Sequence, residues 1–156
     1  MAYQKLQAGR AWAVNKSDNT DIPNIGIAGP TGTTSSGSAT QLIDATATFL
    51  TSGVKLNMIV VNTTDNTQAL VIGIEDNNTL TVSANIFAAS GKSYAIYGGD
   101  QEGAVLYIGT AGNLKVTTVA GDEVTFQGVN TGAFFPVNVT KVFATGTSAD
   151  NIIALW

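Results

Sequence analysis

Cysteine and histidine are both absent from the chain of 156 residues. Without cysteine there is no disulfide, no thiol nucleophile and no thiolate metal ligand, so stability must come from packing, backbone pairing and assembly. Without histidine the chain lacks the usual general base near neutral pH and the commonest transition-metal ligand. The remaining hydrolytic layouts need clustered carboxylates or lysines, and the acidic residues are scattered along the sequence. We therefore expect no enzyme, no catalytic residue, no cofactor and no metal ligand.

Charge is scarce as well. Only 12% of the residues are charged, where about 25% is typical. Seven Lys and Arg face eleven Asp and Glu, the net charge is -4, and Arg10 is the only arginine. A cationic patch for phosphates is not expected, and neither is a nucleic-acid partner. The weakly charged surface is available for contacts between subunits.

Long apolar runs are missing too. No stretch approaches the roughly 18 to 20 consecutive apolar residues that span a bilayer, so no membrane partner is expected. Residues 1–7 lack the apolar segment that a signal peptide needs, so Sec-type export is not expected either. The hydrophobic content of 44% nevertheless allows a real core.

Alternation of apolar and polar residues with period two is the main pattern that is present. It recurs in runs rich in Val, Ile, Thr and aromatic residues, each bounded by turn residues. Strands are predicted at residues 11–14, 58–62, 69–75, 79–82, 93–97, 104–108, 114–118, 123–127, 137–145 and 151–155. Short strands at this spacing are typical of a β-sandwich or barrel.

Turn residues refine this prediction. Asn, Asp and Gly tolerate positive φ, so the turns at residues 76–78, 112–113 and 121–122 predict three hairpins. One short helix is predicted at residues 44–50, although its threonines favour helix only weakly. The predicted fold is therefore almost entirely β.

Two connectors divide the chain. Residues 27–39 are rich in Gly, Ser and Thr, and residues 98–103 contain three glycines; both stretches are interpreted as linkers. They bracket residues 40–97 as a small inserted β domain. The host domain then consists of residues 1–26 and 100–156, so that a sandwich or barrel is formed by both chain ends. Spacing alone equally allows one barrel with two long loops.

A resemblance to a known family favours the insertion. The motif Ser-Asp-x-x-Asp-Ile-Pro stands at residues 17–23, and Val-Leu-Tyr-Ile-Gly-Thr stands at residues 105–110. With Val-Phe-Ala-Thr-Gly-Thr at residues 142–147, these motifs resemble head-spike base proteins of tailed phages and gene transfer agents. The resemblance covers residues 1–25 and 100–156, and it implies a place on the capsid exterior. The middle segment resembles a small β module of phage structural proteins.

Five aromatic residues are candidates for contacts with other subunits or with a capsid: Trp12, Tyr107, Phe134, Phe135 and Trp156. Aromatic side chains bury large areas and are enriched at interfaces. An alternative interpretation is a sugar-binding platform, for which the residues are Tyr3, Trp12, Tyr94, Tyr97, Tyr107 and Trp156.

Aspartate and asparagine gather at residues 18–21 and 76–78. Several hard oxygens in one place suit calcium. The same residue types favour turns whether or not a metal is near, and this interpretation is preferred. Carboxylates such as Asp122 and Glu123 leave an oxygen-only hydrolase as a third, weaker hypothesis.

The sequence thus predicts a virion structural protein on the outer surface of a phage head, made in the host cytoplasm. It would act as a capsid decoration or cement protein, or as the base of a head spike. The expected partners are the major capsid protein, further copies of the chain in a trimer or pentamer, and a spike or fibre protein. The alternative is a receptor- or glycan-binding module of a phage tail or fibre.

Overall fold

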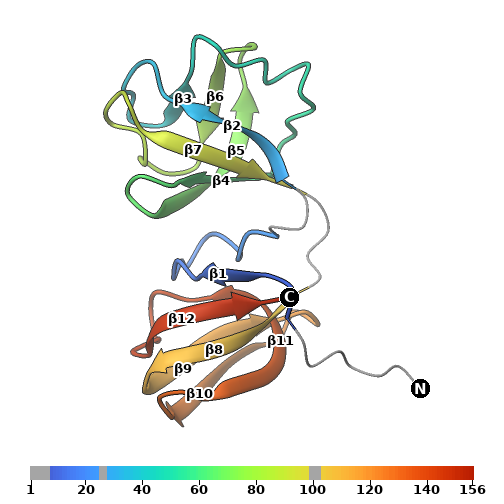
Figure 1. Ribbon diagram of the computed structural model, residues 1–156, viewed down its shortest axis with the longest axis vertical. Coiled ribbons are helices and arrows are strands. Elements are labelled where there is room, and N and C mark those ends of the chain that lie inside the picture. Colours follow the sequence, from blue (N-terminus) through green and yellow to red (C-terminus); the bar gives the residue numbers. More distant parts are fainter. Residues whose placement is uncertain (1–7, 25–27, 99–102) are drawn as a thin grey trace, which may run out of the picture. The chain divides into compact units, whose positions relative to one another are not determined.

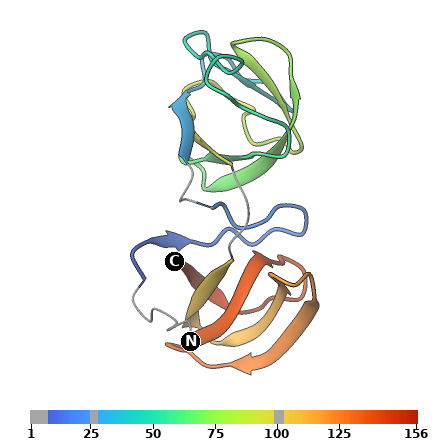
Figure 2. The same ribbon diagram turned by 90° about the vertical axis from the view of Figure 1, so that its right-hand side faces the viewer.

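The computed structural model describes residues 8–24, 28–98 and 103–156. Across these residues the regular secondary structure is β-strand without helix, which confirms the all-β prediction. The strands form two six-stranded antiparallel sheets, each open rather than a closed barrel (Figure 1). The chain divides into a terminal unit, Met1–Ile22 with Gln101–Trp156, and a middle unit, Pro23–Asp100. Each sheet belongs to one unit and curls around its own core (Figure 2).

The terminal unit contains the strands from both ends of the chain. They are β1 (Ala11–Ala13), β8 (Ala104–Thr110), β9 (Gly112–Thr118), β10 (Glu123–Val129), β11 (Phe134–Val142) and β12 (Asp150–Leu155). Their order in the sheet is β1-β12-β8-β11-β9-β10. The start of β11 pairs with β8 and its end pairs with β9, with register shifts in between. Because β11 pairs with β8 at its start and with β9 at its end, the sheet folds over into two facing layers.

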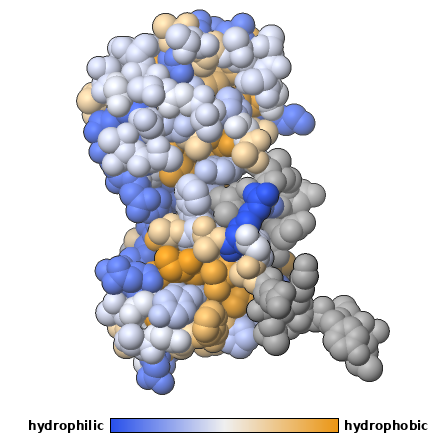
Figure 3. Space-filling view, in the orientation of Figure 1, coloured by the Kyte–Doolittle hydropathy of each residue, from blue (hydrophilic) through white to orange (hydrophobic). Residues whose placement is uncertain are grey.

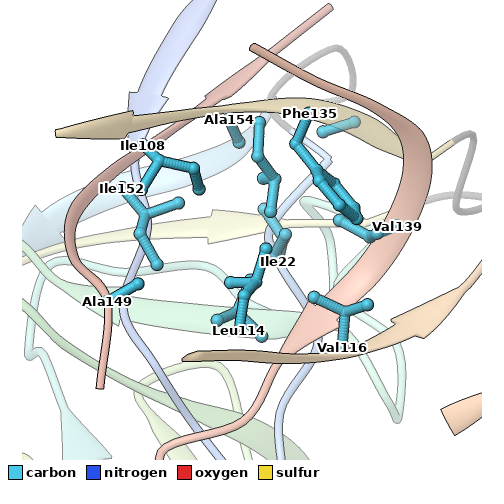
Figure 4. Packing of buried hydrophobic residues seen from close by; sticks show 12 residues of the cluster. Ile22, Ile108, Leu114, Val116, Phe135, Val139, Ala149, Ile152 and Ala154 are labelled. Atoms are coloured by element: carbon cyan, nitrogen blue, oxygen red, sulfur yellow. The ribbon is translucent and has the colours of Figure 1, made fainter. Parts of the chain in front are cut away.

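The core of the terminal unit is mainly aliphatic and lies between these layers (Figure 4). Leu114 and Val116 of β9 face Ile108 of β8 and Ile152 of β12, and all four are almost completely buried. Ile22 enters the same cluster from the segment after β1. Alternation along each strand puts these residues on one face, as the period-two pattern predicts.

The two ends of the chain are joined at one edge of this sheet. Ala11 lies opposite Leu155 and Ala13 lies opposite Ile153. The Trp156 carbonyl accepts hydrogen bonds from the backbone N–H groups of Gly9 at 2.6 Å and Arg10 at 3.2 Å. The terminal unit is therefore complete only when residues far apart in sequence have met.

The middle unit contains the other six strands. They are β2 (Ala28–Thr33), β3 (Gln41–Ile43), β4 (Ile59–Asn62), β5 (Thr67–Ile74), β6 (Thr79–Val82) and β7 (Ser93–Tyr97). Their order is β2-β7-β4-β5-β6-β3, and a single bridge joins Ser36, after β2, to Ile43. Phe49, Phe87 and Tyr94 pack in its core, with ring centroids of Tyr94 6.1 Å from Phe49 and 6.4 Å from Phe87.

The structure corrects three of the predictions. The linker predicted at residues 27–39 includes β2, which pairs with β7 along its length despite its glycines. The helix predicted at residues 44–50 is a run of turns, because Phe49 N–H bonds to Asn77 O at 2.9 Å rather than to its own turn. The hairpin predicted at residues 112–113 does not form, because β11 lies between β8 and β9.

Candidate functional site

Outward-facing side chains of the terminal sheet form an apolar face. Residues directly opposite each other in antiparallel strands share one face of the sheet. The register of the strands places Ala13, Ile153, Tyr107 and Phe134 in one row across β1, β12, β8 and β11. A second row consists of Ala11, Leu155 and Val105. Hereafter, the apolar face means these seven residues: Ala11, Ala13, Val105, Tyr107, Phe134, Ile153 and Leu155.

Much of this face is accessible. Phe134 is 69% exposed, Ala11 and Ala13 are exposed, and the other four residues are half-buried. Hydrophobic surface gathers over this part of the terminal unit in the space-filling view (Figure 3). A clustered apolar surface of this kind marks an interaction site more often than scattered apolar residues do.

The outer side of β9 and β10 is polar by contrast. Its positions are occupied by Lys115, Thr117, Glu123 and Thr125, which lie opposite one another in two pairs. Lys115 Nζ is 3.6 Å from Glu123 Oε2 and 4.3 Å from the centroid of the Phe143 ring. This ion pair joins two adjacent strands across one face of the sheet. The apolar face, by comparison, has no side chain that is charged at neutral pH.

Two of the five predicted contact residues meet on the apolar face. Tyr107 and Phe134 lie opposite each other, with ring centroids 5.4 Å apart at an interplanar angle of 61°. Such an edge-to-face contact stabilises both rings and fixes their orientation. The two side chains therefore form one aromatic ridge on the outside of the sheet.

The other three predicted residues are placed differently. Phe135 is only 8% exposed, and its ring lies 4.6 Å from that of Phe126, so its assignment to a contact surface was wrong. Trp12 lies opposite the buried Ala154 and so belongs to the core side of the sheet. Trp156 packs against the core cluster. In strands with apolar residues on both faces, the alternation of side chains decides which aromatic residue points into the core and which points outward.

Five residues of the apolar face were not predicted as contacts: Ala11, Ala13, Val105, Ile153 and Leu155. In β12, Ile152 and Ala154 point into the core, while Ile153 and Leu155 point outward. A strand that is apolar on both faces is the sequence signal for a second covered surface. That signal was present at residues 152–155.

The Asp- and Asn-rich segments form turns and ion pairs. Asp18 accepts hydrogen bonds from the Thr145 hydroxyl at 2.7 Å and from its backbone N–H at 2.9 Å, and these bonds lower the pKa of Asp18. Asp21 pairs with Lys141 at 3.5 Å. Asp76 Oδ1 accepts the Asn78 N–H at 2.7 Å, as in an Asx turn. Within residues 8–24, 28–98 and 103–156, no three acidic side chains are grouped to hold a metal ion.

Asp44 is a buried carboxylate at the centre of the middle unit. It accepts hydrogen bonds from the Tyr94 hydroxyl at 2.9 Å, the Thr46 hydroxyl at 2.7 Å and the Thr46 N–H at 2.9 Å. Burial opposes ionisation of Asp44, but these bonds outweigh it and lower its pKa. Burial and the Asp44 carboxylate together raise the pKa of Tyr94. A carboxylate so fully engaged holds the structure together and is not available as a general base.

The residues of the alternative sugar platform do not share one exposed surface. Tyr94 is buried in the core of the middle unit, which removes it from any surface. Tyr97 is half-buried, and Tyr3 lies outside the described residues. The Tyr107 and Phe134 ridge is the aromatic surface that this alternative would use.

Comparisons with known proteins leave the function open. No protein-family profile, curated protein or solved structure matches this chain. In the part of the chain that the structure describes, no helix has the length and hydropathy to cross a membrane.

Proposed function

We propose that the protein is a structural component of a tailed-phage particle that docks on the outer surface of the head. It would serve as a decoration protein or as the base of a spike, with the major capsid protein as its partner. The observation that carries this proposal is the apolar face, which spans four strands and presents Phe134 at 69% exposure. The motifs at residues 17–23 and 105–110 supply the phage context through their resemblance to head-spike base proteins.

The geometry suits binding to a fixed protein surface. An open sheet presents a broad layer of side chains, and an interface typically has an apolar centre within a polar rim. Here the centre is the apolar face, whose seven residues include neither Asp, Glu, Lys nor Arg. The net charge of -4 favours the capsid exterior over a site beside packaged DNA.

The test measures rebinding of the purified full chain to heads from which it has been stripped. Tyr107→Ser with Phe134→Ser should weaken binding at least about tenfold, because interface aromatics carry much of the binding energy. Ile72→Ser is the matched control, since Ile72 is 54% exposed but belongs to β5 of the middle unit. Failure of the native protein to bind, or equal losses in both variants, contradicts the proposal.

A second function is favoured by one observation, the exposed ridge of Tyr107 and Phe134. Aromatic rings on a surface also stack against sugars, as a receptor-binding module of a tail or fibre would require. A glycan array distinguishes the two functions. Binding to a host polysaccharide that Phe134→Ser abolishes, without affinity for stripped heads, would replace the first function by the second.

A further inference from the structure

Edge strands are the places where a sheet can pair with another chain. Each open sheet has two of them, β1 and β10 in the terminal unit and β2 and β3 in the middle unit. Proteins block unwanted pairing with short edges, proline and irregular register. β1 and β3 each have three residues, and β2 contains Pro30 at a shift of register. Among the edge strands of the described residues, only β10, with seven residues, lacks these devices over its first part.

The backbone of β10 is free to pair along its outer side. The Thr118 N–H donates to Asp122 O at 2.9 Å, and the register is regular from Glu123 to Phe126. Backbone groups in an antiparallel strand point alternately to the two sides. Those of Val124 and Phe126 therefore face β9, while those of Glu123, Thr125 and Gln127 point away. In the described part of the chain, β9 is the only strand paired with β10.

The side chains of β10 fit a second copy of the same strand. Residues 123–127 read Glu-Val-Thr-Phe-Gln, a sequence that keeps its polar and apolar pattern when reversed. We infer that two copies of the chain pair through β10, antiparallel, about a two-fold axis at Thr125. Thr125 then faces Thr125 of the second copy, Glu123 faces Gln127, and Val124 faces Phe126. Each outward pair exchanges both of its backbone hydrogen bonds.

Charge and burial favour this arrangement. Glu123 is the only charged residue of β10, and the two-fold axis places it beside an amide rather than beside its own copy. A parallel arrangement would align the two Glu123 carboxylates, which costs free energy. On the core side, Val124 is 38% exposed and Phe126 is half-buried. The second strand would cover both, so the pairing buries apolar surface as well as backbone.

This inference rests on the proposed function, because it names one partner of a self-assembling structural protein. Its own readout is the self-association constant of the full chain, measured by analytical ultracentrifugation. Thr125→Pro removes an outward N–H without removing a bond to β9, and it should abolish the dimer. Tyr107→Ser with Phe134→Ser should leave the dimer intact while weakening binding to stripped heads. Loss of head binding alone would thus count against the proposed function and not against the pairing.

Substitutions that change the charge at Gln127 test the register in which the two copies of β10 pair. Gln127→Glu places two carboxylates opposite each other at both ends of the paired strands, and it should weaken the dimer about tenfold. Gln127→Lys creates two Lys–Glu pairs and should tighten it, with both effects shrinking in high salt. Asn138→Asp is the matched control, since Asn138 is an exposed residue of the interior strand β11. A monomeric native protein, equal effects of Gln127→Glu and Asn138→Asp, or a dimer that survives Thr125→Pro overturns the inference.

Discussion

Each of the two units has a six-stranded sheet, but different interactions stabilise the two cores. The core of the middle unit combines three aromatic rings with several buried polar groups, among them Asp44 and Asn62. The Asn62 side chain is fully buried and bonds to Asp65, to Ile86 O at 2.6 Å and to two backbone N–H groups. The core of the terminal unit is mainly aliphatic, and its ion pairs lie near the surface. Buried polar networks fix one arrangement of the chain, because leaving any member unsatisfied is costly.

This difference suggests a division of roles. The middle unit has a buried polar network around Asp44 and Asn62, which specifies its fold. The terminal unit carries apolar residues on both sides of β12 and β8, one set in the core and one on the apolar face. Apolar residues beyond what a core needs are most useful where another protein covers them. The terminal unit is therefore the part of the chain suited to docking.

Removing the middle unit is the largest change that tests this comparison. Each sheet draws all six of its strands from one unit, so a chain that joins Gly26 to Gly103 should keep the terminal sheet. Circular dichroism should show β-structure, and sizing should show a soluble protein. An unfolded or aggregated product would mean that the terminal unit depends on the middle one.

A substitution in the core of one unit should lower the stability of that unit and leave the other unit unchanged. Phe87→Ala removes a fully buried ring of the middle unit and should cost about 3–5 kcal/mol, whereas Leu114→Ala in the terminal unit should cost about 2–5 kcal/mol. Hydrogen exchange followed by residue should show each loss of protection confined to the substituted unit. Equal loss in both units after either substitution would show a single cooperative fold.

The Asp44 network should make the middle unit sensitive to acid. Asp44→Asn weakens its hydrogen bonds and should cost about 1–3 kcal/mol near neutral pH. Because folding lowers the pKa of Asp44, its contribution is present above the unfolded value of about 3.9 and is lost as pH falls through the folded value. Urea unfolding at pH 6 and pH 3 should therefore show a gap between native and variant protein that narrows in acid. A gap that stays constant would show that the Asp44 charge contributes nothing.

Substitutions in surface ion pairs should change the melting temperature least. The size of the change should still differ between the two units. Lys92 Nζ lies 2.8 Å from Asp65 Oδ1, and Asp65 is also bound by the buried Asn62. Lys16 Nζ and Asp150 Oδ1 are 3.5 Å apart, and the Asp150 side chain is 67% exposed. Asp65→Asn should lower the melting temperature more than Asp150→Asn, which should change it little. The reverse order would contradict the role given to the Asn62 network.

Most strands could be predicted because their alternation and turn residues are local properties of the sequence. β2 could not, because Ala-Gly-Pro-Thr-Gly-Thr has the composition of a connector. Its strand depends on tertiary contacts: a Cβ at Gly32 would lie 2.5 Å from Asp44 Oδ2 and 2.6 Å from the Tyr94 hydroxyl oxygen. Glycine is needed there to bring β2 against the Asp44 network, and no local pattern reveals that requirement.

The apolar face was predictable in kind but not in detail. Tyr107 and Phe134 were predicted as contact residues because they are aromatic, and the register places them opposite each other. Phe135 was misassigned because neighbouring residues of a strand point to opposite sides, and sequence alone does not say which side is covered. The middle position of β11 between β8 and β9 could not be predicted, since it reflects pairing across a long connection.

The pairing of β1 with β12 imposes an order of events during synthesis. All strands of the middle unit are synthesised before β8, and β1 has by then no partner. The middle unit can therefore fold first, and its folding draws together residues on either side of it, which shortens the loop that β1 and β12 must close. A nascent chain arrested soon after the middle unit emerges should carry one protease-resistant body behind a susceptible leading segment. Protection of that leading segment would come last, when Leu155 reaches Ala11.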